Sequence, residues 1–276
     1  MTAPQLAFLG GGNMASAIIG GLLRSGQFGP EQISVVEPFV AQRDKLREQF
    51  GALRLLAAAD ASLSTADLVV WAVKPQLFGE AAVACQGAVS QALQLSVMAG
   101  IRSDTLARAT GSERVVRAMP NTPALIGQGI AGLFARAAVS AADRAWTEQV
   151  LKPTGATLWV DQESDLDAVT ALSGSGPAYF FYIVEAMMAA AVEMGLSAEQ
   201  GRQLALATCG GAAALGLASS ESPTVLRERV TSKGGTTCAA INSLKADGVG
   251  DAVQRAVKAA QVRARELGDE FGSSGA

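Results

Sequence analysis

The chain has 276 residues, of which 49% are hydrophobic and 17% are charged, and its formal net charge is −3. This composition excludes a disordered chain, and the length suits about two domains. The slightly acidic balance offers no basic surface for nucleic acid, so we expect a small molecule or a protein as the partner.

The N-terminus and the cysteines indicate a protein of the reducing cytoplasm. No basic residue precedes Arg24, so the charged segment that begins a signal peptide is missing. Cys85, Cys209 and Cys238 are odd in number and far apart, which predicts neither a disulfide framework nor a metal site. The longest uncharged run, residues 203–220, is interrupted by glycines and is typical of a closely packed helix. We therefore expect no bound metal and no membrane contact.

The sequence contains no histidine. This excludes Ser-His-Asp and Cys-His catalytic arrangements and every metal site with histidine ligands. An enzyme of this composition needs a reaction that depends little on general acid–base catalysis. Hydride transfer meets that requirement, because a cofactor supplies the reactive group and the protein mainly positions it.

Short apolar runs alternate with helical patterns through the first half of the chain. This alternation is typical of a parallel sheet with helices on both faces, so we expect an α/β domain over residues 1–162. Strands are predicted at residues 6–9, 33–36, 68–73, 95–98, 114–118, 130–134 and 157–160.

The second half has only helical patterns, and it predicts an all-α domain over residues 163–271. Its helices are rich in Ala and Gly on more than one face, which favours a dimerisation domain. A helix buried within one subunit is the alternative explanation. We expect residues 272–276 to form a flexible tail. Helices are predicted at residues 163–172, 177–194, 198–217, 223–230, 236–246 and 251–267.

The first predicted strand leads into a glycine-rich segment and then into a helix. Residues 10–15 read Gly-Gly-Gly-Asn-Met-Ala and satisfy the pattern G-x-G-x-x-A. Gly10 allows a tight turn, Gly12 lets the backbone approach a pyrophosphate, and Ala15 allows close helix packing. Strand, glycines and helix in this order predict a Rossmann-type domain that binds NADP(H) or NAD(H), with Asn13 and Met14 beside the cofactor. A purely structural turn is the alternative.

Glu37 ends the second predicted strand, where an acidic group can accept hydrogen bonds from the ribose hydroxyls of the cofactor. In that role Glu37 favours NAD over NADP. Arg43 follows closely and can meet a 2′-phosphate, and an ordinary surface acid is the alternative for Glu37. The sequence therefore leaves the cofactor preference open.

The strand predicted at residues 68–73 ends in a second candidate segment. Open α/β sheets bind ligands beyond the carboxyl ends of their strands, which places Ala72, Val73, Lys74 and Pro75 beside the cofactor. Pro75 also suits the first turn of a helix. A solvent-exposed surface lysine is the alternative interpretation of Lys74.

Two proline- or glycine-rich loops complete the candidate site. Residues 119–123 read Met-Pro-Asn-Thr-Pro, and the two prolines make a stiff loop that either holds Asn121 near the nicotinamide or serves as a structural turn. Residues 171–179 read Ala-Leu-Ser-Gly-Ser-Gly-Pro-Ala-Tyr and open the helical domain close to the cofactor. An interdomain hinge is the alternative for this second loop.

Residues 230–237 read Val-Thr-Ser-Lys-Gly-Gly-Thr-Thr at the start of a predicted helix. Paired glycines let the backbone approach a ligand, and the free N–H groups of a helix start attract a negative group. The hydroxyls of Ser232, Thr236 and Thr237 can then orient a small polar ligand. A helix start capped by Ser and Thr explains this segment equally well on its own.

Five segments, in this order along the chain, resemble the pyrroline-5-carboxylate reductase family. The resemblance covers nearly the whole length of the sequence. Glu37 is the main departure, because many members prefer NADPH and an acid at this position repels the extra phosphate. The segments are Phe-Leu-Gly-Gly-Gly-Asn-Met-Ala at 8–15, Ala-Val-Lys-Pro-Gln at 72–76, Met-Pro-Asn-Thr-Pro-Ala at 119–124, Ser-Gly-Ser-Gly-Pro-Ala-Tyr at 173–179, and the stretch 223–244 with its Val-Thr-Ser-x-Gly-Gly-x-Thr core.

The resemblance implies reduction of 1-pyrroline-5-carboxylate to L-proline by NAD(P)H, the last step of proline synthesis. It also implies a Rossmann-type N-terminal domain and a helical C-terminal domain that forms an interlocked homodimer, often assembled into a higher homo-oligomer in this family. The substrate carboxylate is expected on Ser232, Gly234, Gly235, Thr236 and Thr237. Thr237 matches the family's hydroxyl that hydrogen-bonds the ring nitrogen, so it is the expected catalytic residue.

Two rival interpretations share part of this pattern. Hydroxyacid dehydrogenases of the 6-phosphogluconate type carry a catalytic lysine in a G-x-G-x-x-x-K helix start, which falls on Phe180 when the glycines are aligned with Gly174 and Gly176. Because position 180 is not a lysine, alcohol oxidation lacks its general base. A dinucleotide-binding scaffold without catalysis is the second rival, and the intact segment 232–237 argues against it. The sequence assigns no role to Lys233 and does not exclude related cyclic imino acids as substrates.

Overall fold

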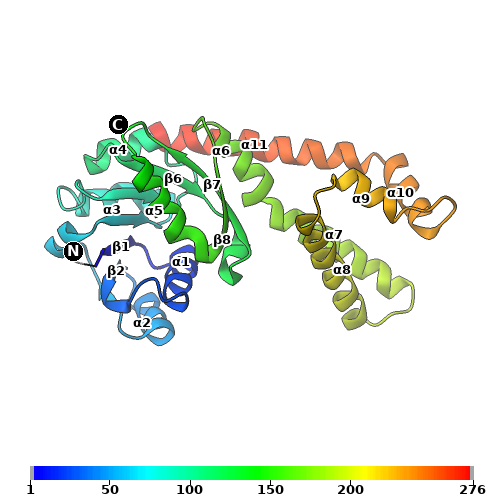
Figure 1. Ribbon diagram of the computed structural model, residues 1–276, viewed down its shortest axis with the longest axis horizontal. Coiled ribbons are helices and arrows are strands. Elements are labelled where there is room, and N and C mark those ends of the chain that lie inside the picture. Colours follow the sequence, from blue (N-terminus) through cyan, green and yellow to red (C-terminus); the bar gives the residue numbers. More distant parts are fainter. Residues whose placement is uncertain (1–2, 274–276) are drawn as a thin grey trace. The chain divides into compact units, whose positions relative to one another are not determined.

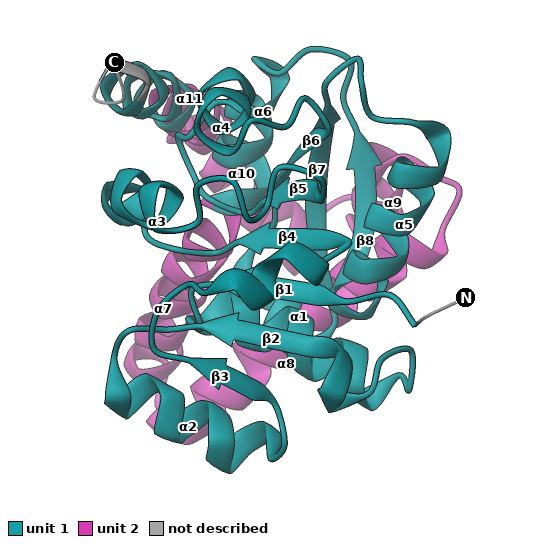
Figure 2. Ribbon diagram, turned by 90° about the vertical axis from the view of Figure 1, so that its left-hand side faces the viewer, with its two compact units in different colours: residues 1–174, 260–276 teal, residues 175–259 magenta. Residues whose placement is uncertain are grey.

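The computed structural model describes residues 3–273 of the chain (Figure 1). The chain divides into two compact units, which Figure 2 shows in different colours. Unit 1 comprises the residues up to Gly174 together with those from Ala260 onward, and unit 2 comprises Ser175–Ala259. Unit 1 contains a sheet with its covering helices, whereas the described residues of unit 2 form helices and their connections.

Unit 1 is built on an eight-stranded sheet in the order β3-β2-β1-β4-β5-β6-β7-β8. The strands from β1 to β6 are parallel, β7 runs antiparallel to β6, and β8 is parallel to β7. The predicted parallel sheet is thus confirmed for β1 to β6, and the last two strands run the other way. The strands are β1 (Leu6–Leu9), β2 (Ile33–Val36), β3 (Arg54–Leu56), β4 (Leu68–Trp71), β5 (Leu93–Ser96), β6 (Val115–Met119), β7 (Gly129–Ala135) and β8 (Gly155–Trp159).

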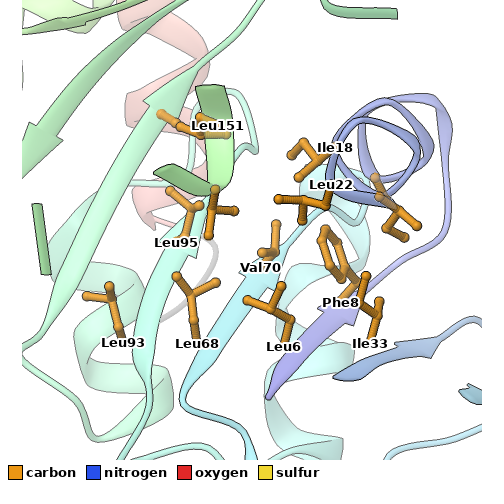
Figure 3. Close-up of a cluster of buried hydrophobic side chains, with 14 of the residues drawn as sticks. Leu6, Phe8, Ile18, Leu22, Ile33, Leu68, Val70, Leu93, Leu95 and Leu151 are labelled. Carbon is orange, nitrogen blue, oxygen red and sulfur yellow. The ribbon is translucent and has the colours of Figure 1, made fainter. Parts of the chain in front are cut away.

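Helices cover both faces of the sheet. Successive side chains of a strand point to opposite faces, so each strand contributes side chains to a core on either face. Leu6 and Phe8 of β1 belong to a core with Ile18 and Leu22 of the helix α1 (Asn13–Arg24) (Figure 3). The alternate residues of β1 belong to a second core on the other face, which includes Trp71 of β4 and side chains of the helices α3 (Phe78–Ala84) and α4 (Ser103–Thr110). Strands buried on both faces hold the sheet in the middle of unit 1.

The helices of unit 1 are α1 (Asn13–Arg24), α2 (Val40–Phe50), α3 (Phe78–Ala84), α4 (Ser103–Thr110), α5 (Ala141–Leu151) and α6 (Asp165–Val169), which a π-helical segment, η6 (Thr170–Gly174), extends. Short 3-10 helices are η1 (Pro30–Gln32), η2 (Ala61–Thr65), η3 (Pro75–Leu77), η4 (Thr122–Ile126) and η5 (Lys152–Thr154). Unit 2 contains α7 (Gly176–Glu193), α8 (Ala198–Ala218), α9 (Pro223–Arg229), α10 (Thr236–Ala246) and the first part of α11 (Val249–Ser273).

Most predicted elements are confirmed within two or three residues, and α10 has the predicted bounds. The short strand β3 was not predicted, because its three residues begin with an exposed Arg54 and show no clear alternation. Helix α11 is longer than predicted and continues through Ser273, so two residues of the expected flexible tail are helical. The rest of that tail, residues 274–276, lies outside the described residues.

The second part of α11 returns to unit 1. Phe271 packs against the second core, and a Cβ atom on Gly100 would lie 2.7 Å from the ring of Phe271. Arg102 and Asp269 form an ion pair between the loop before α4 and α11. These contacts explain why unit 1 includes the residues from Ala260 onward. The domain boundary expected from the sequence, between residues 162 and 163, stays a prediction.

Candidate functional site

The carboxyl ends of the parallel strands meet at one edge of the sheet in unit 1. Strand β1 lies between β2 and β4, so the chain order reverses beside β1, and such a switch point is where open α/β sheets bind ligands. Every residue expected at the cofactor follows one of these strand ends. The edge collects Gly10–Met14 after β1, Glu37 after β2, Ala72–Pro75 after β4 and Asn121 after β6.

The three glycines after β1 have three different surroundings. Gly10 has φ +94°, and a Cβ atom there would lie 2.7 Å from the carbonyl oxygen of Ala72. A Cβ atom on Gly11 would lie 2.5 Å from the side chain of Leu46. Beside Gly12, in contrast, the Cβ position has no atom within 4 Å other than those of the adjoining chain. The backbone is therefore packed at Gly10 and Gly11 and open at Gly12.

Gly12 also begins helix α1 without a side-chain cap. The first N–H groups of a helix have no partner within it, and together with the helix dipole they attract an anion. Asn13 is exposed, and Met14 is half-buried against the first core. An uncapped helix start with open space at its glycine fits the pyrophosphate of a dinucleotide.

Glu37 lies at the expected place after β2, but its carboxylate is turned into the protein. Its Oε2 atom accepts a hydrogen bond from the N–H of Gly11 at 2.9 Å, and its Oε1 atom accepts one from the N–H of Phe39 at 3.0 Å. The residue is only 6% exposed. Arg43 donates from Nη1 to the carbonyl oxygens of Glu37 and Pro38, at 2.6 and 2.8 Å.

The segment after β4 passes directly beside the glycines. The carbonyl carbon of Ala72 and the amide nitrogen of Val73 lie 2.9 and 3.0 Å from the Cβ position of Gly10. Lys74 is exposed and precedes the 3-10 helix η3, which Pro75 begins. The structure thus brings Ala72 and Val73 into contact with the glycine loop and leaves the side chain of Lys74 in solvent.

Asn121 is fixed between β6 and β7. Its Oδ1 atom accepts a hydrogen bond from the N–H of Ile130 at 3.0 Å, and the residue precedes η4. The side chain of Met119, two residues earlier, approaches the π-helical segment, where a Cβ atom on Gly174 would lie 2.9 Å from Met119 Cε. The two prolines and these contacts make residues 119–123 a braced loop.

The expected substrate residues lie in unit 2, at the start of α10. Gly234 has φ +75°, and Gly235 precedes the helix with no side-chain cap. Ser232 is close to Gly235, because a Cβ atom there would lie 2.6 Å from Ser232 Oγ. Thr237 is half-buried, whereas Thr236 is exposed. The capping alternative does not apply, so the first N–H groups of α10 remain available to an anion.

Sequence reasoning missed one residue of the glycine loop and one residue that contacts it. Gly11 was treated as a variable position, although side chains hold both its N–H and its carbonyl group. Gln42 of α2 is the second, since its Nε2 atom donates to the carbonyl oxygen of Gly11 at 2.6 Å. A glutamine on an otherwise polar helix gives no sequence signal for such a contact.

Comparisons with known proteins identify the family. A model described as pyrroline-5-carboxylate reductase dimerisation matches residues 163–267, and one described as NADP oxidoreductase, coenzyme F420-dependent, matches residues 5–100. A pyrroline-5-carboxylate reductase from Pseudomonas aeruginosa is 44% identical over 274 residues, which cover 99% of this chain and 100% of the relative. The chain belongs to the pyrroline-5-carboxylate reductase family.

Solved pyrroline-5-carboxylate reductases share the fold over nearly the whole chain. The protein from Coxiella burnetii is 35% identical with a TM-score of 0.88, covering 96% of this chain and 99% of that one. The protein from Plasmodium falciparum, solved with NADP bound, is 28% identical with a TM-score of 0.85, covering 97% and 99%. The family resemblance and the fold class predicted from the sequence are therefore confirmed, and the chain carries the dimerisation domain of pyrroline-5-carboxylate reductases.

Proposed function

We propose that this chain reduces 1-pyrroline-5-carboxylate to L-proline with NADPH, as the last step of proline biosynthesis. The observation that carries the proposal is the 44% identity to a pyrroline-5-carboxylate reductase over 99% of the chain. The match of residues 5–100 to an NADP oxidoreductase model supports NADPH as the hydride donor. The reaction is thus an NADP-dependent reduction of a C=N bond.

We assign the cofactor to the carboxyl edge of the sheet. The uncapped start of α1 and the open space at Gly12 support a pyrophosphate site formed by Gly10, Gly12, Asn13 and Met14. The contact between the glycine loop and the end of β4 supports a role for the backbone of Ala72 and Val73, followed by Lys74 and Pro75. The hydrogen bond from the N–H of Ile130 fixes the side chain of Asn121, which supports our assignment of Asn121 to the nicotinamide end of the cofactor.

We assign the substrate carboxylate to the start of α10. Its uncapped N–H groups and the paired glycines support binding by Ser232, Gly234, Gly235, Thr236 and Thr237. Hydrogen bonds to a charged group contribute about 1.5–3 kcal/mol each, and a helix end adds about 0.3–1 kcal/mol. Thr237 is the proposed catalytic residue, because its hydroxyl can hydrogen-bond the ring nitrogen.

The lack of histidine is consistent with this chemistry. A protonated cyclic imine is already an electrophile, so the protein needs to align the imine carbon with the hydride more than to move protons. Alignment of two bound reactants supplies on the order of 7–11 kcal/mol of a barrier. The proposed reaction therefore requires no histidine.

We further propose that the protein is a cytoplasmic homodimer. The helical stretch Asp165–Glu193 is long and apolar enough to cross a membrane, and only 17% of its most apolar part is buried within the chain, so most of that part needs a covering surface. Exposed apolar side chains of α7 and α8, such as Tyr182 (73% exposed) and Leu217 (90% exposed), need a partner surface. The dimerisation match at residues 163–267 supports a second copy of this chain over a lipid surface.

A steady-state assay with NADPH and with NADH tests the proposed function. We expect oxidation of NADPH that depends on 1-pyrroline-5-carboxylate and produces L-proline, and a mass in solution of at least twice 28.1 kDa, with larger multiples marking further assembly of dimers. Cofactor binding without turnover would support the scaffold interpretation instead. Activity restricted to another cyclic imino acid would change the substrate and keep the reaction class.

A further inference from the structure

Side chains hold both polar backbone groups of Gly11, its N–H and its carbonyl group. The N–H of Gly11 donates to Glu37 Oε2 at 2.9 Å, and the carbonyl oxygen accepts from Gln42 Nε2 at 2.6 Å. The side chain of Leu46 closes the remaining side, 2.5 Å from where a Cβ atom on Gly11 would lie. Gly11 lies between Gly10, with its positive φ, and Gly12, which begins α1. Its orientation therefore sets the direction in which the loop enters the helix.

The carboxylate of Glu37 is committed to this task. Its second oxygen accepts from the N–H of Phe39 at 3.0 Å, so the carboxylate joins the glycine loop to the start of α2. The residue is 6% exposed, whereas an acid that binds ribose hydroxyls must present an oxygen to the ligand. Two backbone N–H donors also offset its negative charge.

We propose that Glu37 and Gln42 are positioning residues that clamp Gly11 and hold the glycine loop in the shape that binds the cofactor, and that Glu37 does not read the adenosine ribose. This inference rests on the proposed NADPH-dependent function. The clamp fixes the loop before the cofactor arrives, which lowers the ordering cost of binding. It acts on the pyrophosphate, which NADPH and NADH share, so it strengthens binding of both cofactors alike.

The clamp also explains how an acid at the end of β2 is compatible with NADPH. The carboxylate faces Gly11 and Phe39, and the guanidinium of Arg43 is held next to it by the carbonyl oxygens of Glu37 and Pro38. The positive Arg43 is half-buried, while the negative Glu37 is turned inward. A 2′-phosphate then meets no exposed carboxylate from Glu37.

Two variants test the clamp, each with a matched control on α2. Glu37→Gln keeps the size of the side chain but places an amide NH₂ where one of two N–H donors now binds, and Gln42→Ala removes the bond to the Gly11 carbonyl. Glu48→Gln and Gln49→Ala change exposed residues of α2. The measurements are the dissociation constants of NADPH and NADH by titration calorimetry, the melting temperature without cofactor, and kcat at saturating cofactor.

We expect each clamp variant to weaken binding of both cofactors by about tenfold, which corresponds to the loss of about one hydrogen bond. The NADH-to-NADPH ratio of dissociation constants and the kcat at saturation should stay within about twofold of wild type, as should all values for the controls. The double variant should lose less than the product of the single losses, because both side chains hold the same residue, Gly11.

Three results would overturn the clamp. A changed ratio of dissociation constants in Glu37→Gln would show that Glu37 reads the ribose. If the wild-type protein binds NADPH and both variants bind it equally tightly, the two contacts do not act on the cofactor. A fall of kcat together with the melting temperature in Gln42→Ala would show a general folding role. A wild-type protein that binds neither cofactor would contradict the proposed function itself.

Discussion

Gly10 and Ala72 lie so close together that a Cβ atom on Gly10 would lie 2.7 Å from the carbonyl oxygen of Ala72. The contact joins the end of β1 to the end of β4 at the point where the order of the sheet reverses. Gly12, two residues later, has no atom within 4 Å of its Cβ position other than those of the adjoining chain. The backbone is therefore packed at Gly10 and open at Gly12, where we propose that the cofactor approaches.

Alanine at these two positions should separate stability from cofactor binding. Gly10→Ala places a side chain against backbone at φ +94° and should lower the free energy of unfolding by about 2–4 kcal/mol. Gly12→Ala should cost about 1 kcal/mol or less, yet weaken NADPH binding by at least about tenfold, because its Cβ occupies the space for the pyrophosphate. Chemical denaturation measures the free energy of unfolding, and calorimetric titration measures the affinity for NADPH. Normal NADPH affinity in Gly12→Ala would refute the assigned pyrophosphate site.

Thr237→Ala should lower turnover and leave cofactor affinity near the wild-type value. The hydroxyl is proposed to hydrogen-bond the ring nitrogen, so its loss should reduce kcat by about 10- to 100-fold. Ser243→Ala, an exposed position further along α10, is the matched control and should keep wild-type kinetics. Equal loss of turnover and NADPH affinity in Thr237→Ala would instead indicate collapse of the loop at residues 232–235.

Asp143 should stabilise unit 1 in a pH-dependent way. Burial opposes ionisation of this carboxyl, but hydrogen bonds from Arg114 and Ser140 outweigh it and lower the pKa of Asp143. A lowered pKa contributes stability that is present above the ordinary Asp value of about 3.9 and is lost as the pH falls through the folded-state pKa. Asp143→Asn should therefore cost about 1.5–3 kcal/mol at pH 7, and the difference should shrink below about pH 4.

Denaturant unfolding at pH 7 and pH 3 measures the effect of Asp143→Asn. The exposed pair of Asp44 and Arg47 provides the control, because Asp44→Asn should change stability by about 0.5 kcal/mol or less. A cost of Asp143→Asn that is the same at both pH values would contradict the role of the ionised carboxylate.

Cys85 should be unreactive in the native protein. Burial raises the pKa of its thiol to about 11, and the side chain is 2% exposed. Because the thiolate is the reactive form, a disulfide reagent at pH 8 should react with the same number of thiols in the wild type and in Cys85→Ala. After unfolding in guanidinium the wild type should show one more reactive thiol than Cys85→Ala. A fast-reacting native thiol that Cys85→Ala removes would contradict this burial.

The sequence was sufficient for the features that depend on neighbouring residues. The bounds of β1 and β2 follow from short apolar runs, and the turn at Gly10 follows from the glycines between a strand and a helix. Helix α10 was predicted from Thr236 to Ala246 because glycines precede a continuous helical pattern. Each of these signals lies within about ten residues of the feature that it predicts.

The direction of β7 and the contacts between residues distant in the sequence were not predicted. The short connection by residues 120–128 explains why β7 runs antiparallel to β6, since a parallel crossover takes about a dozen residues or more. The inward turn of Glu37 depends on the N–H groups of Gly11 and Phe39, and Gln42 meets Gly11 across 31 positions of the sequence. No periodicity or spacing records such contacts.

Transfer of deuterium from NADPD tests the central claim most directly. The protein is incubated with 1-pyrroline-5-carboxylate and NADPH that carries deuterium at the transferred position, and the product is analysed by mass spectrometry and NMR. The proposed function predicts L-proline with one deuterium on the ring carbon that was double-bonded to nitrogen. Oxidation of the cofactor without labelled L-proline, or no oxidation with a protein that binds NADPH, would contradict it.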